Sequence, residues 1–281
     1  MRADLHVHSN ASDGTDDPAE VMRRAAAAGL DVVALTDHDT TAGHARARAA
    51  LTGSLILLPG MELSSELAGR SVHLLAYLFD PAHPGLAAET ARIRDDRVLR
   101  AQGMVRKLNA LGAPVSWERV AGIAGDSVIG RPHIARAMAQ AGVVAEPADA
   151  FTKDWIADDG RAYVEKYALP PARAIGLVRD AGGVAVLAHP RAGRDWDLSD
   201  EQIANLTADG LAGIEVWHRD HGPEERTALL ALATRLGLIP TGGSDDHGEL
   251  TGYSIGSELA APDTYDRLLA AAGAAAAPGS P

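Results

Sequence analysis

Two histidines near the N-terminus, His6 and His8, are spaced as metal ligands on one strand would be. They end a short apolar run that begins at Arg2, and residues two apart on a strand project to the same side. Both imidazoles can therefore reach one metal ion from the C-terminal end of the strand, and the carboxylate of Asp13 follows shortly after. The alternative is that these are two ordinary histidines near a strand end.

Further potential ligands recur along the chain and favour the metal interpretation. Nine side chains fall at or just past the C-terminal ends of six expected strands: His6, His8, Asp13, His38, Glu62, His73, His189, Asp245 and His247. Active sites of α/β barrels and open α/β sheets are built at that end of the strands. By contrast, we expect His44 and His83 to be surface residues.

The composition limits the kind of site and the partners. There is no cysteine, which excludes disulfides, thiolate ligands and cysteine nucleophiles, so a metal must be held by nitrogen and oxygen. The formal net charge of −12 opposes stable binding of duplex nucleic acid. No basic-then-apolar signal segment opens the chain, and no apolar stretch approaches the ~18–20 residues of a membrane span. We therefore expect a cytoplasmic protein that does not contact membranes.

The pattern of elements predicts an α/β fold with an insertion. Short apolar strands alternate with helices, which is typical of a parallel sheet, and seven strands are expected, at residues 2–6, 32–36, 55–58, 71–78, 184–187, 213–216 and 238–241. Asp17 and Pro18 mark the start of the first helix. Between the fourth and fifth strands the alternation gives way to helices expected at 87–111, 116–123, 132–141 and 148–156. We thus predict one domain from residues 1–84 and 166–281, and a helical insertion domain at 85–165.

Five motifs together resemble the PHP (polymerase and histidinol phosphatase) family. They are Asp4-Leu5-His6-Val7-His8-Ser9, Thr36-Asp37-His38-Asp39, Pro59-Gly60-Met61-Glu62, Ala188-His189-Pro190 and Gly243-Ser244-Asp245-Asp246-His247. The resemblance covers nearly the whole chain and implies a distorted (β/α)7 barrel of the amidohydrolase-like kind. The inserted residues 130–137, which begin Gly130-Arg131-Pro132-His133, resemble the branch that hydrolyses nucleoside 3′,5′-bisphosphates, AMP-like nucleotides or the 5′ end of short RNA.

The resemblance also implies a metal centre of two or three divalent ions. His6, His8, Glu62 and Asp245 would hold the first ion. Glu62 would bridge to the second, which His73 and His189 complete, and Asp13, His38 and His247 would hold the third. An aromatic residue often precedes the last histidine in this family. Asp246 departs from that pattern and could alter the pocket or the electrostatic field at the third site. The mixed ligands suit manganese, with iron or zinc as alternatives.

Charge arithmetic supports a phosphate substrate. Three carboxylates carry −3 and three divalent ions would carry +6, which leaves +3 in an otherwise acidic protein and attracts phosphate. Paired metals can clamp a phosphoryl group and lower the pKa of a bridging water, so we expect a metal-bridging hydroxide as the nucleophile, with Glu62 and Asp245 as its catalytic carboxylates. No nucleophile from the protein is needed.

Other side chains are candidates for substrate binding and proton transfer. The resemblance places Arg131 and His133 over the metals, where they would hold substrate phosphate together with Arg191; the alternative is that they are surface and capping residues. His218 is our candidate for the acid that protonates the leaving oxygen, and His221 is a second candidate; both could instead only shape the pocket. Asp37 and Asp39 would either orient His38 or cap the next helix.

We therefore predict a hydrolase of phosphoric ester bonds, acting on a phosphate monoester of a small nucleotide. One alternative is a phosphatase for another small phosphate ester, such as histidinol phosphate. The other is a non-catalytic metal-binding PHP module, for which eroded ligands would be expected.

Overall fold

The computed structural model describes residues 1–167, 169–192, 197–250, 252 and 254–275. The chain divides into two compact units. The first, here called the barrel unit, comprises residues 1–89 and 168–281, and the second, the helical unit, comprises residues 90–167.

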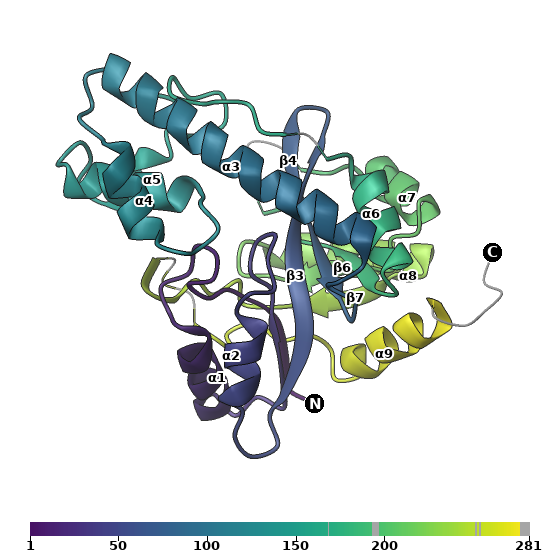
Figure 1. The fold of residues 1–281 in the computed structure, drawn as a ribbon. Coiled ribbons are helices and arrows are strands. Elements are labelled where there is room, and N and C mark those ends of the chain that lie inside the picture. The colour runs from purple at the N-terminus through teal and green to yellow at the C-terminus, as the bar shows by residue number, and fades with distance from the viewer. Residues whose placement is uncertain (168, 193–196, 251, 253, 276–281) are drawn as a thin grey trace. The chain divides into compact units, whose positions relative to one another are not determined.

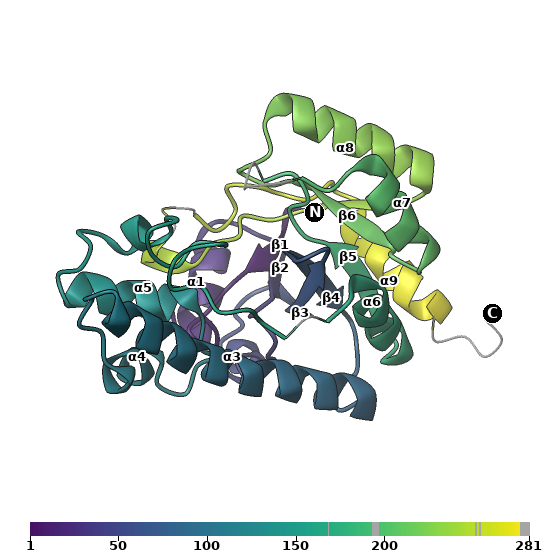
Figure 2. The same cartoon turned by 90° about the horizontal axis from the view of Figure 1, so that it is seen from above.

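Seven strands form one sheet in chain order, and the sheet closes on itself to give a nearly complete barrel (Figure 2). Closure joins the first and last strands, because the backbone of Asp245 donates to His6 at 2.8 Å and that of His8 donates to Asp246 at 2.9 Å. The predicted seven-stranded α/β barrel is confirmed. Its strands are β1 (Ala3–Val7), β2 (Val32–Leu35), β3 (Ile56–Leu67), β4 (Arg70–Tyr77), β5 (Val184–Leu187), β6 (Gly213–Trp217) and β7 (Ile239–Gly242).

Helices cover the outside of the barrel (Figure 1). Helix α1 starts as predicted, with the side chain of Asp17 accepting from the backbone of Ala19 and Pro18 in the first turn. One cluster of buried hydrophobic side chains draws on several strands and includes Leu5, Leu75 and Val186. The helices of this unit are α1 (Pro18–Ala27), α2 (His44–Ala49), α6 (Pro171–Asp180), α7 (Asp200–Ala208), α8 (Pro223–Leu236) and α9 (Thr264–Ala275), with a short 3-10 turn, η2 (Gly248–Leu250).

The expectation of an all-parallel sheet is wrong at β4, which is antiparallel to both β3 and β5. Ala68 and Gly69 link β3 to β4 with φ of 52° and 78°, which is the backbone of a tight two-residue hairpin. His73 lies within β4 and not at its C-terminal end. Because β4 runs antiparallel to β3, His73 pairs with Ser64, two residues beyond Glu62. His73 thereby reaches the same rim as the other candidate ligands.

Strand β3 also continues through Pro59 and Gly60, beyond the expected end of the third strand at residue 58. Gly60 is required by packing, because a Cβ there would lie 2.8 Å from a side-chain carbon of Thr36. The long strand carries Glu62 into the centre of the barrel mouth. His44 was expected on the surface, but it is half-buried and its Nε2 donates to the carbonyl of Gly60 at 2.8 Å, which ties α2 to β3.

The helical unit has its own core. It contains most of α3 (Pro84–Ala110), together with α4 (Trp117–Ala124), α5 (Arg131–Gln140) and the 3-10 turn η1 (Pro147–Ala150). Met104, Leu108, Ile134 and Met138 are fully buried within it. The helix expected over residues 148–156 is wrong, since only one 3-10 turn forms there. No helix in the described ranges of either unit is both long and apolar enough to cross a membrane.

Candidate metal centre

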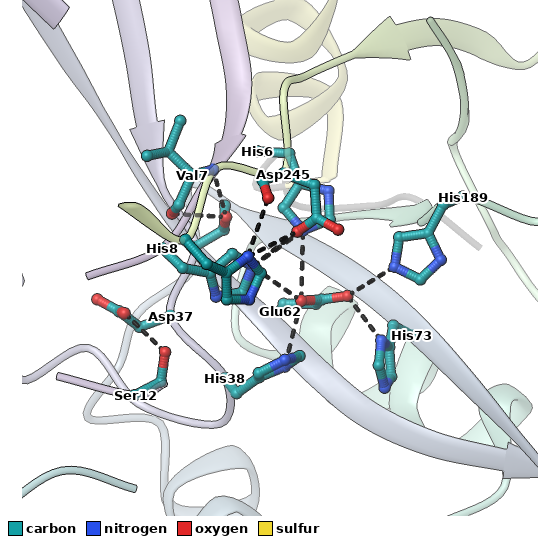
Figure 3. Close-up of polar contacts among 12 residues, drawn as sticks. His6, Val7, His8, Ser12, Asp37, His38, Glu62, His73, His189 and Asp245 are labelled. Carbon is teal, nitrogen blue, oxygen red and sulfur yellow. Dashed lines mark hydrogen bonds and ion pairs between the residues drawn. The ribbon is translucent and has the colours of Figure 1, made fainter. Parts of the chain in front are cut away.

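The nine predicted ligands converge in overlapping groups of donors. Figure 3 shows the other ligands that it labels arranged around the carboxylate of Glu62: His6, His8, His38, His73, His189 and Asp245. One group joins Nε2 of His6, Nε2 of His8, Oε2 of Glu62 and Oδ1 of Asp245, with five of the distances between these atoms at 3.1–3.3 Å. A regular tetrahedron with edges of about 3.2 Å has its centre about 2 Å from each corner, close to the metal–ligand bonds of ~2.0–2.2 Å found for imidazole and carboxylate. The first group therefore has the size and donors of a metal site.

The second oxygen of Glu62 faces a different set of imidazoles. Its Oε1 lies 2.8 Å from Nδ1 of His73 and 3.1 Å from Nε2 of His189. The two oxygens of one carboxylate thus point to two groups, as a bridging carboxylate must. His38 lies between the groups: its Nδ1 is 3.2 Å from Oε2 of Glu62, and His38, Glu62 and His73 each offer a ligand atom within 4.8 Å of the other two.

A third group surrounds Asp13. Its Oδ1 lies 3.4 Å from Nε2 of His247, and its Oδ2 lies 3.8 Å from Nε2 of His38. His8 also borders the group, with Nδ1 3.9 Å from Oδ1 of Asp13. His38 therefore faces Glu62 and Asp13 with different ring nitrogens, whereas the family resemblance implied that it belongs to the third group alone.

The donor chemistry fits divalent metal ions. Among the described residues, four buried site atoms have no hydrogen-bond partner in the protein, namely Nδ1 of His8, His38 and His73 and Oδ1 of Asp245. Carboxylate oxygens approach two of these nitrogens, but outside hydrogen-bond alignment. Buried polar atoms left unpaired cost about 1–3 kcal/mol each, so their gathering at one place indicates that a ligand completes them.

The carboxylates of the cluster favour the binding of cations, because neighbouring imidazoles keep them ionised. Burial by itself raises the pKa of Glu62, but the imidazoles of His38, His73 and His6 hold that pKa well below its usual range. Burial lowers the pKa of His8, yet the neighbouring carboxylates of Asp245 and Glu62 raise the pKa to about 10. Without metal, protons therefore balance the carboxylates, and a bound metal would displace them.

Glu215 belongs to the site but was not identified from the sequence. Its carboxylate is fully buried on β6, accepts from Nδ1 of His6 at 3.2 Å and accepts from the backbone N–H of His189 at 2.8 Å. His189 has a φ of 25°, so this second bond secures a strained backbone. The signal was present in the sequence as one carboxylate in the apolar strand Gly213-Ile214-Glu215-Val216.

Asp37 and Asp39 hold segments that lie next to candidate ligands. Asp37 accepts from the backbone and hydroxyl of Ser9 at 2.8 and 2.7 Å and from the hydroxyl of Ser12 at 2.8 Å. Asp39 accepts from the backbone and hydroxyl of Ser64 at 2.7 and 2.8 Å. Asp37 thus orders the turn that carries Asp13, and Asp39 fixes β3 near Glu62.

The hydrogen bonds distinguish the two candidate acids. Nδ1 of His218 accepts from the backbone of Asp220 at 3.1 Å, which places the ring proton on Nε2, 3.4 Å from Oδ2 of Asp245. His221 uses both nitrogens on the backbone, since Nδ1 donates to Val216 at 3.0 Å and Nε2 accepts from Arg191 at 3.3 Å. His218 therefore presents a donor to the metal centre, while His221 supports the turn after His189.

The predicted phosphate-binding residues lie in different parts of the chain. Arg191 follows His189 in the barrel unit, and its guanidinium pairs with Asp200. In the helical unit, Arg131 starts α5 and its Nη1 donates to Asp158 at 2.8 Å. His133 is buried in the same turn, with Nδ1 accepting from the backbone of Gly130 at 3.0 Å. Their contact with phosphate stays a prediction.

Comparison with known proteins agrees with this geometry. Residues 4–86 match the PHP domain. The chain is 36% identical over 247 residues to the 3′,5′-nucleoside bisphosphate phosphatase of Chromobacterium violaceum, covering 87% of this chain and 86% of the relative. It is 33% identical over 266 residues to the 5′-3′ exoribonuclease Rnm of Escherichia coli strain K12, covering 92% and 89%. A crystal structure from Bifidobacterium adolescentis, provisionally named a metal-dependent phosphoesterase, superposes with a TM-score of 0.90 at 38% identity over 96% of both chains.

Proposed function

This chain belongs to the PHP family and hydrolyses phosphoric ester bonds, and from that premise we propose that it is a metal-dependent phosphatase of small nucleotides. The substrates proposed are a nucleoside 3′,5′-bisphosphate, an AMP-like nucleotide and the 5′ end of short RNA. The relatives named for such substrates support this choice, as does the Gly130-Arg131-Pro132-His133 segment. A non-catalytic PHP module would have lost ligands, whereas all nine candidate side chains converge here.

The observation that carries the proposal is the position of Glu62 between two groups of donors. Its Oε2 belongs to the compact set with His6 and His8, and its Oε1 faces His73 and His189. Divalent ions held there, manganese in our proposal, would polarise the phosphoryl oxygens and supply a nucleophile from water at neutral pH. The third group around Asp13 would hold a further ion.

The residues of the chain then have separate tasks. Glu62 and Asp245 supply the negative charge that holds the metals, and Asp245 also keeps His218 directed at the centre. Nε2 of His218 carries the ring proton and would donate a hydrogen bond that stabilises the negative charge on the leaving oxygen as the ester bond breaks. Arg131, His133 and Arg191 would bind the phosphate charge. A cap domain, which we propose spans residues 85–165 and so contains most of the helical unit, would select the nucleoside.

The decisive experiment measures phosphate release before and after exhaustive chelation. Substrates are adenosine 3′,5′-bisphosphate, AMP, a 5′-phosphorylated short RNA and histidinol phosphate. We expect chelation to abolish turnover of the nucleotides, Mn²⁺ to restore it, and Glu62→Ala to prevent restoration, with exposed Glu201→Ala as the matched control. Full activity of the stripped protein would refute the proposal, and a preference for histidinol phosphate would refute the nucleotide assignment.

A further inference from the structure

Asp246 lies between two candidate ligands and replaces the aromatic residue expected there, so its charge needs an explanation. The side chain is fully buried. Arg24 of α1 meets it with a two-pronged contact, Nη1 to Oδ2 at 2.8 Å and Nη2 to Oδ1 at 3.0 Å. Oδ2 also accepts from the backbone of Gly248 at 3.2 Å. A two-pronged contact between a guanidinium and a carboxylate fixes the orientation of both groups, and it places a positive charge beside Asp246.

The same arginine also binds the other side of the third group. Nη1 of Arg24 contacts the carboxylate of Asp16, whose carbonyl accepts from the backbone of Asn10 at 2.7 Å. Asp16 ends the turn that carries Asp13, here called the Asp13 loop (residues 9–16). Asp246 belongs to the segment that carries Asp245 and His247, here called the Asp245 loop (residues 243–248). One side chain from a helix thus joins two loops that are far apart in the sequence.

The two loops are in close contact beside Arg24. The backbone of Thr15 donates to the carbonyl of His247 at 3.1 Å. Gly248 has a φ of 70°, and a Cβ there would lie 2.1 Å from the hydroxyl of Thr15, so only glycine permits this approach. The carbonyl of Asp246 itself accepts from the backbone of His8. Three members of the third group, His8, Asp13 and His247, therefore lie on segments that meet at this junction.

We propose that Arg24 is a positioning residue for the third metal group, holding Asp13 and His247 in register through Asp16 and Asp246. The inference rests on the proposed metal centre. It assigns a task to Asp246 as well: its ion pair with the half-buried Arg24 fixes the Asp245 loop. Partners that hold metal ligands in place typically contribute about 10- to 100-fold to metal affinity.

The test is a double-mutant cycle read by Mn²⁺ binding. The stripped protein is titrated with Mn²⁺, and free ion is counted by electron paramagnetic resonance, which gives the number of sites and their dissociation constants. The variants are Arg24→Met, Arg24→Lys, Asp13→Ala and the Arg24→Met/Asp13→Ala double variant. Arg23→Met is the matched control, because Arg23 neighbours Arg24 on α1 but is mostly exposed and pairs only locally with Glu20.

We expect Arg24→Met to weaken by about 10- to 100-fold the same site that Asp13→Ala removes, and to leave the other sites unchanged. In the Asp13→Ala background, Arg24→Met should change the remaining sites by less than about twofold. Arg24→Lys keeps the charge without the two-pronged geometry and should give an intermediate loss. Arg23→Met should bind like the wild type.

Three outcomes would contradict the inference. Equal weakening of every site by Arg24→Met would show a general structural role, and unchanged binding in all Arg24 variants would show none. If Arg24→Met does not fold, Arg24→Lys decides through the same cycle, and wild-type binding by that folded variant overturns the inference. A wild-type protein that binds no Mn²⁺ would instead refute the metal centre itself, which separates the two proposals.

Discussion

Glu215 accepts a hydrogen bond from Nδ1 of His6 at 3.2 Å, and neither side chain is exposed. This contact fixes the His6 proton on Nδ1 and leaves Nε2 as the donor atom for a metal. Because the same carboxylate also binds the backbone of His189, it connects the first group to the second.

We therefore predict that Glu215→Gln lowers Mn²⁺ affinity by about 10- to 100-fold. A glutamine keeps the shape of the side chain but loses the charge, and its single carbonyl oxygen cannot replace both acceptors of Glu215. The measurement is a calorimetric titration of the stripped protein. Glu224→Gln, an exposed position on α8, is the control. Equal affinities in Glu215→Gln and the wild type would show that the contact does not support the metal centre.

Much of the site could be predicted because most of its ligands lie at strand ends, where a histidine or carboxylate by itself indicates a possible metal ligand. His6, His38 and His189 each follow a short apolar run, and the barrel then brings strand ends together. Glu215 was missed since it lies within a strand, where a carboxylate has meaning only once its buried partners are known.

The reversal of β4 could not be predicted from periodicity for a related reason. The alternation of apolar runs and helices along the sequence identifies a strand, but it does not tell whether that strand runs parallel or antiparallel to its neighbours. The only local sign of a hairpin was Gly69 after Ala68. Likewise, the third strand was expected to end at residue 58, but β3 continues through Pro59 and Gly60, where glycine permits the close approach of Thr36. In both cases contacts between distant segments decided the structure.

His218→Leu tests the hydrogen bond proposed from His218 to the leaving oxygen. Loss of this donor should lower turnover of AMP by about 10²- to 10³-fold, because the charge that develops on the leaving alkoxide is then left without its partner. With p-nitrophenyl phosphate the loss should be smaller, since the nitrophenolate is already a stable leaving group. Mn²⁺ binding should be retained and serves as the internal control. An equal loss on both substrates would contradict a contact between His218 and the leaving oxygen and would indicate a role in shaping the site.

Arg131→Met tests the proposed binding of phosphate by the helical unit. Removing a guanidinium that holds a phosphate should lower kcat/KM for adenosine 3′,5′-bisphosphate by about 10- to 100-fold, from the ~1.5–3 kcal/mol of a hydrogen bond to a charged group. The number of bound Mn²⁺ ions should not change, because the residue is not a ligand in our assignment. Arg119→Met, on the exposed side of α4, provides the matched control. An unchanged kcat/KM would remove Arg131 from the phosphate site.

His221 gives a prediction for stability against pH. Burial lowers the pKa of His221, and its bond to Val216 offsets this only in part, so the folded protein holds the ring neutral where an unfolded chain, with a pKa near ~6.5, takes up a proton. Between these two pKa values the unfolded state binds more protons, and the free energy of unfolding therefore falls as the pH drops below ~6.5.

The His221→Asn variant isolates this effect. Asparagine can keep the donor to Val216 but loses the acceptor for Arg191, so the variant should be less stable than the wild type at pH 8. The deficit should shrink toward pH 5, because only the wild type carries the penalty of a neutral imidazole there. Urea unfolding of both proteins at pH 5, 6, 7 and 8 measures it. A deficit that stays constant or grows toward pH 5 would show that His221 is protonated in the folded protein, and would return it to the candidates for proton transfer.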